Sequence, residues 1–91
     1  MKNIAIIGAG AWGTALAMVA RRAGRNVVLQ AHEPEVAEAI NGSHENLLFL
    51  PGVALDPEIR ATNDPAEAAV DTDVVLLVVP TQFLRAVLTG L

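Results

Sequence analysis

The sequence predicts an α/β fold in which a parallel β-sheet carries helices on both faces. Short apolar runs, typical of strands buried on both faces, alternate with segments whose apolar residues recur at helical spacing. Alternating strands and helices form right-handed βαβ units, which place their strands parallel in one sheet. The composition is 53% apolar with 18% charged residues, which excludes a disordered chain and predicts a packed core.

The first part of the chain predicts two strands with a helix between them. The strands are expected at residues 4–7 and 27–31, which are short and rich in apolar side chains. The helix is expected to begin at Ala11 and to stop before Gly24. Its predicted apolar face consists of Leu16, Val19, Ala20 and Ala23. The cations near its C-terminal end, which are expected to stay in solvent, are Arg21, Arg22 and Arg25.

A second helix and a long loop are expected next. Pro34 suits the first position of a helix that stops before Gly42. Its predicted apolar face consists of Val36, Ala37 and Ile40. Residues 43–57 contain apolar side chains without a period and are interrupted by two prolines and a glycine. They therefore predict a long ordered loop, and loops of this length usually carry a function.

A short third strand is expected at residues 59–61, followed by a short helix. In that helix Asp64 is the expected N-cap, Pro65 takes the first position, and Glu67 completes a capping box. The strongest signal for a buried strand is the later apolar run that begins at Val74 and ends at Val79. A further helical pattern follows in Phe83, Leu84, Val87 and Leu88.

Charge and composition limit the possible partners. The net charge is −4, so the chain as a whole does not attract nucleic acid or an anionic membrane, and any bound phosphate must be held locally. The absence of cysteine excludes disulfides and thiolate metal sites. The apolar run near the N-terminus breaks at Gly8, too early for a signal peptide, and no run approaches the roughly 20 residues that span a bilayer. We expect a soluble, cytoplasmic protein with no nucleic-acid or membrane partner.

Three glycines stand between the first predicted strand and the first predicted helix. Gly8, Gly10 and Gly13 form the pattern G-x-G-x-x-G, and Glu33 follows 20 positions after Gly13. The first glycine permits a tight turn, the second lets a pyrophosphate approach the backbone, and the third lets the helix pack on the strand. Although a plain glycine-rich turn is the alternative, the context predicts a dinucleotide site in a Rossmann-like sheet of strand order 3-2-1-4.

Four stretches resemble the NAD(P)-dependent glycerol-3-phosphate dehydrogenase family. They are IGAGAWGTALA, VVLQAHEPE, NLLFLPGV and DVVLLVVPTQFLR, which occur in the family's order and spacing. The aromatic residue before the third glycine, Trp12, is characteristic of this family. The resemblance implies the interconversion of glycerol 3-phosphate and dihydroxyacetone phosphate by hydride transfer to or from NAD or NADP.

The motif and the resemblance together imply ten contacts with the cofactor. These are Gly8, Gly10, Ala11, Trp12, Gly13, His32, Glu33, Pro80, Gln82 and Phe83. The first five lie on the glycine-rich segment, the next two would flank the adenosine ribose, and the last three would border the nicotinamide. Because the family often has a hydroxyl residue at the position of Ala11, one hydrogen bond to the phosphates would be missing. No catalytic residue or metal ligand is implied within this chain.

Several of these residues also have a structural interpretation. Trp12 could pack in the core, since aromatic side chains bury a large apolar area. His32 could be a solvent-exposed residue after a strand, without a role in binding. The stretch NLLFLPG, residues 46–52, could be a buried apolar loop.

The resemblance covers only the N-terminal portion of the family's cofactor domain, without its catalytic lysines or its helical substrate-binding domain. Lys2 is the one lysine, and it precedes the first predicted strand. We therefore expect residues 1–91 to bind the adenosine and pyrophosphate part of the cofactor and to be inactive alone. The alternative is a non-catalytic nucleotide-sensing or assembly module. Reductases for ketopantoate or sugar acids share the glycine fingerprint, but the stretch NLLFLPG argues against them.

The strand from Val74 to Val79 also predicts self-association. In a sheet of order 3-2-1-4 this strand would normally have a further neighbour, and no charge or internal proline protects its edge. We expect a symmetric dimer in which two copies of this strand pair antiparallel, with Phe83 and Leu84 in the same interface.

Overall fold

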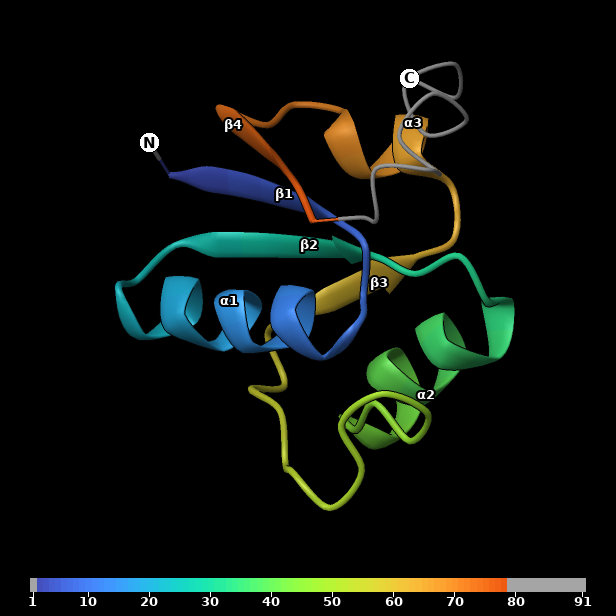
Figure 1. Cartoon of the computed structure of the whole chain (residues 1–91). Helices are drawn as coiled ribbons and strands as arrows, with labels where there is room; N and C mark the ends of the chain where they lie inside the picture. The colour runs from blue at the N-terminus through green and yellow to red at the C-terminus, as the bar shows by residue number, and fades with distance from the viewer. Residues whose placement is uncertain (1, 79–91) are drawn as a thin grey trace.

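Four parallel strands form one sheet in the order β3-β2-β1-β4 (Figure 1). The computed structural model describes residues 2–78. β1 (Asn3–Ile7) lies between β2 (Asn26–Gln30) and β4 (Val74–Leu77), and β3 (Arg60–Thr62) pairs with the outer side of β2. The predicted strand order is confirmed, with each strand within two residues of its expected bounds.

Helices cover both faces of the sheet, as predicted. α1 (Ala11–Arg22) and α2 (Pro34–Ser43) lie on one side, and α3 (Pro65–Ala69) lies on the other (Figure 1). Because side chains alternate along a strand, Ile6 joins the larger apolar cluster with α1 and α2, whereas Ala5 and Ile7 pack with Ala68 of α3. The larger cluster includes the predicted face of α2, formed by Val36, Ala37 and Ile40.

The predicted apolar face of α1 is wrong at Leu16, Val19 and Ala23, which are exposed, whereas Ala20 does pack against the larger cluster. Leu16 and Val19 are 36% and 60% exposed, whereas the buried residues of the helix are Gly13, Thr14 and Ala17. The first turns of the helix lie so close to the sheet that its fully buried residues are all small, and Met18 packs at the margin of the cluster. Larger apolar side chains on the neighbouring positions therefore point to solvent.

The segment after α2 is an ordered loop, as expected, and it is fixed to the rest of the fold. Leu55 and Ile59 are buried in the larger cluster. The Arg21 guanidinium lies 3.2 Å from the Asp56 carboxylate, so the prediction that Arg21 stays free in solvent is wrong. The backbone N–H of Glu58 and, after it, Arg21 hold the pKa of Asp56 below its usual value. The helix α2 includes Gly42 and ends at Ser43, and its C-cap, His44, has a positive φ of 56°.

Only part of the predicted capping of α3 is present. Asp64 is the N-cap and accepts a hydrogen bond from the N–H of Ala66, with Pro65 in the first turn. The backbone N–H of Asp64 donates to Oγ1 of Thr62 instead of to Glu67, so the capping box does not form.

The strand β4 lies at an edge among the described residues and is not buried on both faces. Val75, Leu76 and Leu77 are 38–40% exposed. The N–H of Val78 still donates to the carbonyl of Ile7, which extends the pairing with β1. Val79 and the helical pattern expected after it lie outside the described residues. Within residues 2–78, no helix is long and apolar enough to cross a membrane.

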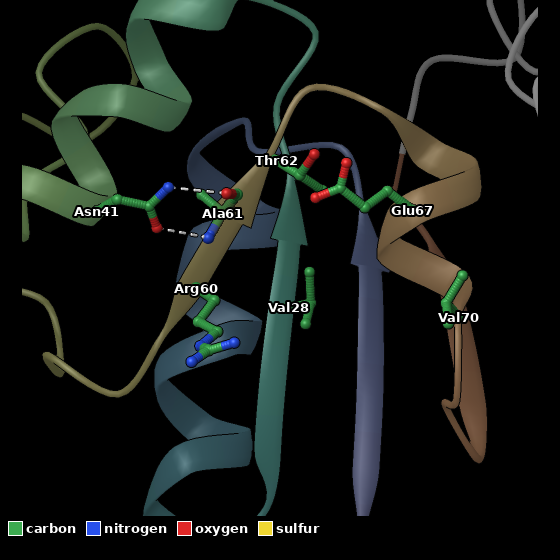
Figure 2. A pocket seen from close by; sticks show the side chains of 7 residues that line it. All are labelled: Val28, Asn41, Arg60, Ala61, Thr62, Glu67 and Val70. Carbon is green, nitrogen blue, oxygen red and sulfur yellow. Dashed lines mark hydrogen bonds between the residues drawn. The ribbon is translucent and has the colours of Figure 1, made fainter.

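The opposite edge of the sheet is covered by a side chain. The side-chain amide of Asn41 forms two hydrogen bonds with the backbone of Ala61, each 2.8 Å long (Figure 2). Its Nδ2 donates to the Ala61 carbonyl, and its Oδ1 accepts from the Ala61 N–H, so both backbone groups that face away from β2 have a partner. A groove of about 520 Å³ lies beside β3, lined by Val28, Asn41, Arg60, Ala61, Thr62, Glu67 and Val70 (Figure 2). None of the predicted site residues lines it.

Candidate nucleotide-binding site

The candidate site lies at the carboxyl ends of β1 and β2. The N–H of Gly8, directly after β1, donates to the carbonyl of Gln30 at the end of β2 at 3.0 Å. This bond places the glycine-rich turn beside the segment that contains His32 and Glu33. β1 lies between β2 and β4, and the helix that follows β1, α1, lies on the opposite face of the sheet from α3, the helix that precedes β4 (Figure 1). In open α/β sheets, ligands bind at such a switch point.

Each of the three glycines has a distinct geometry. Gly8 has a φ of 113°, which L side chains rarely adopt, so the expected tight turn is present. A Cβ atom on Gly13 would overlap the backbone carbonyl of Gly8, so the expected close packing of helix on strand is present as well. A Cβ atom on Gly10 would meet nothing within 4 Å. The backbone at Gly10 is therefore open to an approaching molecule.

The first turn of α1 has the electrostatic character of an anion site. Gly10 is the N-cap and offers no side chain, and the turn contains no acidic residue. The first N–H groups of a helix have no partner within the helix, and the helix dipole places partial positive charge beside them. A phosphate would satisfy these donors without a cationic side chain.

The structure separates the two interpretations of Trp12. Its side chain is 77% exposed, so the core-packing interpretation is wrong, and Ala11 beside it is exposed as well. His32 is exposed and Glu33 is half-buried. The backbone carbonyl of Glu33 accepts from the N–H groups at the start of α2, while its carboxylate makes no capping bond. Its carboxylate is thus not used to cap the helix.

Seven of the ten predicted contacts are gathered around one turn. They lie on the turn after β1, in the first turn of α1 and directly after β2: Gly8, Gly10, Ala11, Trp12, Gly13, His32 and Glu33. Pro80, Gln82 and Phe83 lie outside the described residues. Within residues 2–78 no three His, Asp or Glu side chains lie close enough together to hold a metal ion.

The sequence interpretation missed Asn46. This residue is fully buried, and its Nδ2 donates to the Ala9 carbonyl at 2.8 Å and to Thr14 Oγ1 at 2.9 Å. The one available signal was that Asn46 opens the stretch NLLFLPG. The interpretation of that stretch as a buried loop is wrong, because Leu47, Leu48 and Phe49 are exposed.

A family comparison identifies the chain. Residues 3–91 match the model described as the N-terminus of NAD-dependent glycerol-3-phosphate dehydrogenase. The chain belongs to this family. The resemblance stated from the sequence is thereby confirmed, and so is the Rossmann-like fold.

Individual members of the glycerol-3-phosphate dehydrogenase family agree with this assignment. The chain is 63% identical over 87 residues to glycerol-3-phosphate dehydrogenase [NAD(P)+] of Rhodospirillum rubrum, covering 96% of this chain and 25% of that protein. It is 59% identical over 89 residues to the enzyme of the same name from Caulobacter vibrioides, covering 98% and 27%. The solved glycerol-3-phosphate dehydrogenase of Plasmodium falciparum superimposes with a TM-score of 0.87 at 33% identity, covering 98% of this chain and 28% of that one. The chain thus spans about a quarter of the length of these relatives.

Proposed function

We propose that this chain binds NAD or NADP at the start of α1. The observation that carries the proposal is the first turn of that helix, which combines an open glycine backbone with no cap side chain and no acidic residue. The family supports the same ligand, since the relatives from Rhodospirillum and Caulobacter are named for NAD(P)+. The adenosine ribose would lie beside His32 and Glu33, and Ala11 and Trp12 would contact the cofactor from the turn.

Trp12 provides a direct test of cofactor binding. It is the one tryptophan of the chain, it is mostly exposed, and it lies in the first turn of α1. Because tryptophan emission overlaps the absorption of reduced nicotinamide, bound NADH or NADPH should quench it. Titration with ADP-ribose, which lacks the nicotinamide, should compete. The proposal would be contradicted if ADP-ribose did not compete, or if quenching rose linearly with the concentration of NADH or NADPH without saturating.

We propose that a longer chain containing these residues interconverts glycerol 3-phosphate and dihydroxyacetone phosphate by hydride transfer. This reaction would serve glycerophospholipid metabolism. Residues 1–91 would bind cofactor without turnover. Lys2 supports this, because it lies at the amino end of β1, whereas the glycine turn follows the carboxyl end. An assay with dihydroxyacetone phosphate and NADH or NADPH tests it. Turnover that follows the 91-residue chain through purification would contradict inactivity, and cofactor binding without turnover in a longer chain would favour a nucleotide-sensing module.

The nicotinamide side of the site remains a prediction. Pro80, Gln82 and Phe83 would border the nicotinamide ring, on the segment that follows β4. If they do, Gln82→Ala should weaken binding of NADH more than binding of ADP-ribose, because only NADH carries the ring. Equal losses for both ligands would place Gln82 elsewhere.

We further propose that the 91-residue chain self-associates through β4. Three consecutive residues of this strand, Val75 to Leu77, are 38–40% exposed and carry no charge that would oppose pairing. Two copies would pair antiparallel across a two-fold axis, with Phe83 and Leu84 in the interface. Sedimentation equilibrium tests this, with Val75→Lys expected to shift the dimer towards monomer. Val75 is preferable to Val78, which packs against the larger core cluster. A folded monomer at all concentrations would contradict the proposal.

A cytoplasmic location and the absence of nucleic-acid or membrane partners complete the proposal. The absence of such partners rests on the net charge of −4. The lack of cysteine gives no information about the compartment, and the cytoplasm is the default location. Fractionation of cells that express the protein, followed by immunodetection, would check the location.

A further inference from the structure

Every polar group of the buried Asn46 side chain has a partner. Nδ2 donates to the carbonyl of Ala9 at 2.8 Å and to Oγ1 of Thr14 at 2.9 Å, and Oδ1 accepts from the N–H of Phe49 at 3.1 Å. The backbone carbonyl of Asn46 also accepts from the N–H of Leu50 at 2.9 Å. A fully bonded buried amide has one preferred orientation, because any rotation would leave a buried donor or acceptor without a partner. Asn46 therefore joins the loop after α2 rigidly to the glycine turn.

Thr14 extends this network by one residue of the turn. Its hydroxyl is buried, accepts from Asn46 and donates to the carbonyl of Gly10 at 2.9 Å. A hydroxyl group can do both at once. Asn46 thus holds the Ala9 carbonyl directly and supports, through the Thr14 hydroxyl, the Gly10 carbonyl, which also accepts from the backbone N–H of Thr14 at 3.0 Å.

The direction of these carbonyls determines the direction of the next N–H groups. The described peptide bonds are trans, and in a planar trans peptide the C=O and the following N–H point in opposite directions. Since the carbonyls of Ala9 and Gly10 point into the buried network, the N–H groups of Gly10 and Ala11 point away from it. The backbone at Gly10 is also uncovered, since a Cβ atom there would meet nothing within 4 Å.

We propose that Asn46 is a positioning residue of the cofactor site, which orients the N–H groups of Gly10 and Ala11 towards the pyrophosphate through Ala9 and Thr14. The inference rests on the proposed function. Without the network the Ala9–Gly10 peptide loses its buried partner and the Gly10–Ala11 peptide keeps only the bond from the Thr14 N–H, so a bound phosphate would have to order them. Asn46 would touch no part of the cofactor and would act through the backbone alone.

Two neutral substitutions that keep the number of side-chain heavy atoms and their branching test the proposal in the 91-residue chain. Asn46→Leu and Thr14→Val remove hydrogen bonds without adding a charge that repels phosphate. We expect each to weaken binding of ADP-ribose about tenfold, as loss of a preorganised donor pair would. Binding of adenosine, which has no phosphate, should be unchanged. Thr14→Ser keeps the hydroxyl and should bind ADP-ribose like the unaltered chain.

Asn41→Ala is the matched control. It also removes an amide with two hydrogen bonds to backbone, but at the outer edge of β3, and should leave the affinity for ADP-ribose unchanged. Equal losses of adenosine and ADP-ribose binding in Asn46→Leu would mean that Asn46 only supports the fold. Unchanged ADP-ribose binding in Thr14→Val would overturn the proposal even where Asn46→Leu fails to fold.

Backbone ¹⁵N relaxation of the ligand-free chain separates this inference from the proposed function. The order parameters of the Gly10 and Ala11 N–H groups should fall in Thr14→Val and stay unchanged in Asn41→Ala. Unchanged values in Thr14→Val would overturn the positioning role whether or not the chain binds a nucleotide. Failure of the unaltered chain to bind ADP-ribose would instead overturn the proposed function.

Discussion

A Cβ atom on Gly13 would overlap the carbonyl oxygen of Gly8, so the first turn of α1 lies directly against the turn that ends β1. We predict that Gly13→Ala lowers the free energy of unfolding by at least about 2 kcal/mol, because backbone on both sides would have to move. The overlapped atom is main chain and not the end of a flexible side chain, so no rotamer change can relieve it. Urea denaturation followed by circular dichroism measures the change.

Gly42→Ala is the control for this substitution. Gly42 lies within α2, and a Cβ atom there would meet nothing within 4 Å. Because alanine favours helix over glycine, the free energy of unfolding should rise by about 0.5 kcal/mol. If Gly13→Ala were as stable as Gly42→Ala, the close packing of α1 on the glycine turn would be wrong.

Asp73 makes the stability depend on pH at the acidic end. Its carboxylate accepts hydrogen bonds from the backbone N–H groups of Asn3 and Lys2, each at 2.9 Å, and these bonds lower its pKa. A lowered pKa in the folded state means that the stabilisation is present above the unfolded value of about 3.9 and is lost as the pH falls through the folded value. In Asp73→Asn the decline in stability below about pH 4 should therefore be shallower. If the urea midpoint fell equally with pH in Asp73→Asn and in the unaltered chain, the prediction would be contradicted.

Asn41 protects the outer edge of the sheet. Asn41→Ala should lower the free energy of unfolding by about 1 kcal/mol, because the N–H and C=O of Ala61 lose their partners. The uncovered edge should also increase aggregation, since it can pair with another chain. Thermal unfolding and light scattering measure the two effects. Glu38→Ala, an exposed position on the same helix, is the control and should change neither.

Glu33 is predicted to favour NAD over NADP. A carboxylate at the end of β2 can accept hydrogen bonds from the ribose 2′-OH and repels a 2′-phosphate. Glu33→Ala should reduce the preference for NADH over NADPH about tenfold, measured as the ratio of dissociation constants. Glu35→Ala removes an equal charge in the first turn of α2 and should leave the ratio unchanged. An unchanged ratio in Glu33→Ala would mean that its side chain faces away from the ribose.

The sheet could be predicted from the sequence because its strands are short apolar runs separated by strong helix signals. The apolar face of α1 could not. Helical spacing identifies Leu16 and Val19 as a face, but the distance between α1 and the sheet decides which face is buried. That distance is set by Gly13, and at such short range Ala17 and Thr14 fit where Leu16 would not.

The candidate site likewise has a part that could be predicted from the sequence and a part that could not. Its glycines and Glu33 belong to a local pattern and could be predicted from spacing. Asn46 acts over 37 positions of sequence, and no local pattern gives the direction of its amide. The pairing of Arg21 with Asp56, 35 positions apart, escaped prediction for the same reason.

If the cofactor binds at the bare N-terminus of α1, as proposed, it would also stabilise the fold. An aspartate in place of Gly10 would cap the helix and stabilise the ligand-free protein by a few tenths of a kcal/mol or more. It would also place a negative charge where the pyrophosphate would lie. The natural glycine leaves that stabilisation to the ligand, which adds RT ln(1 + [L]/Kd) when it binds only the folded chain. Molecules without cofactor would unfold more often and be degraded sooner, so the amount of protein would follow the supply of dinucleotide.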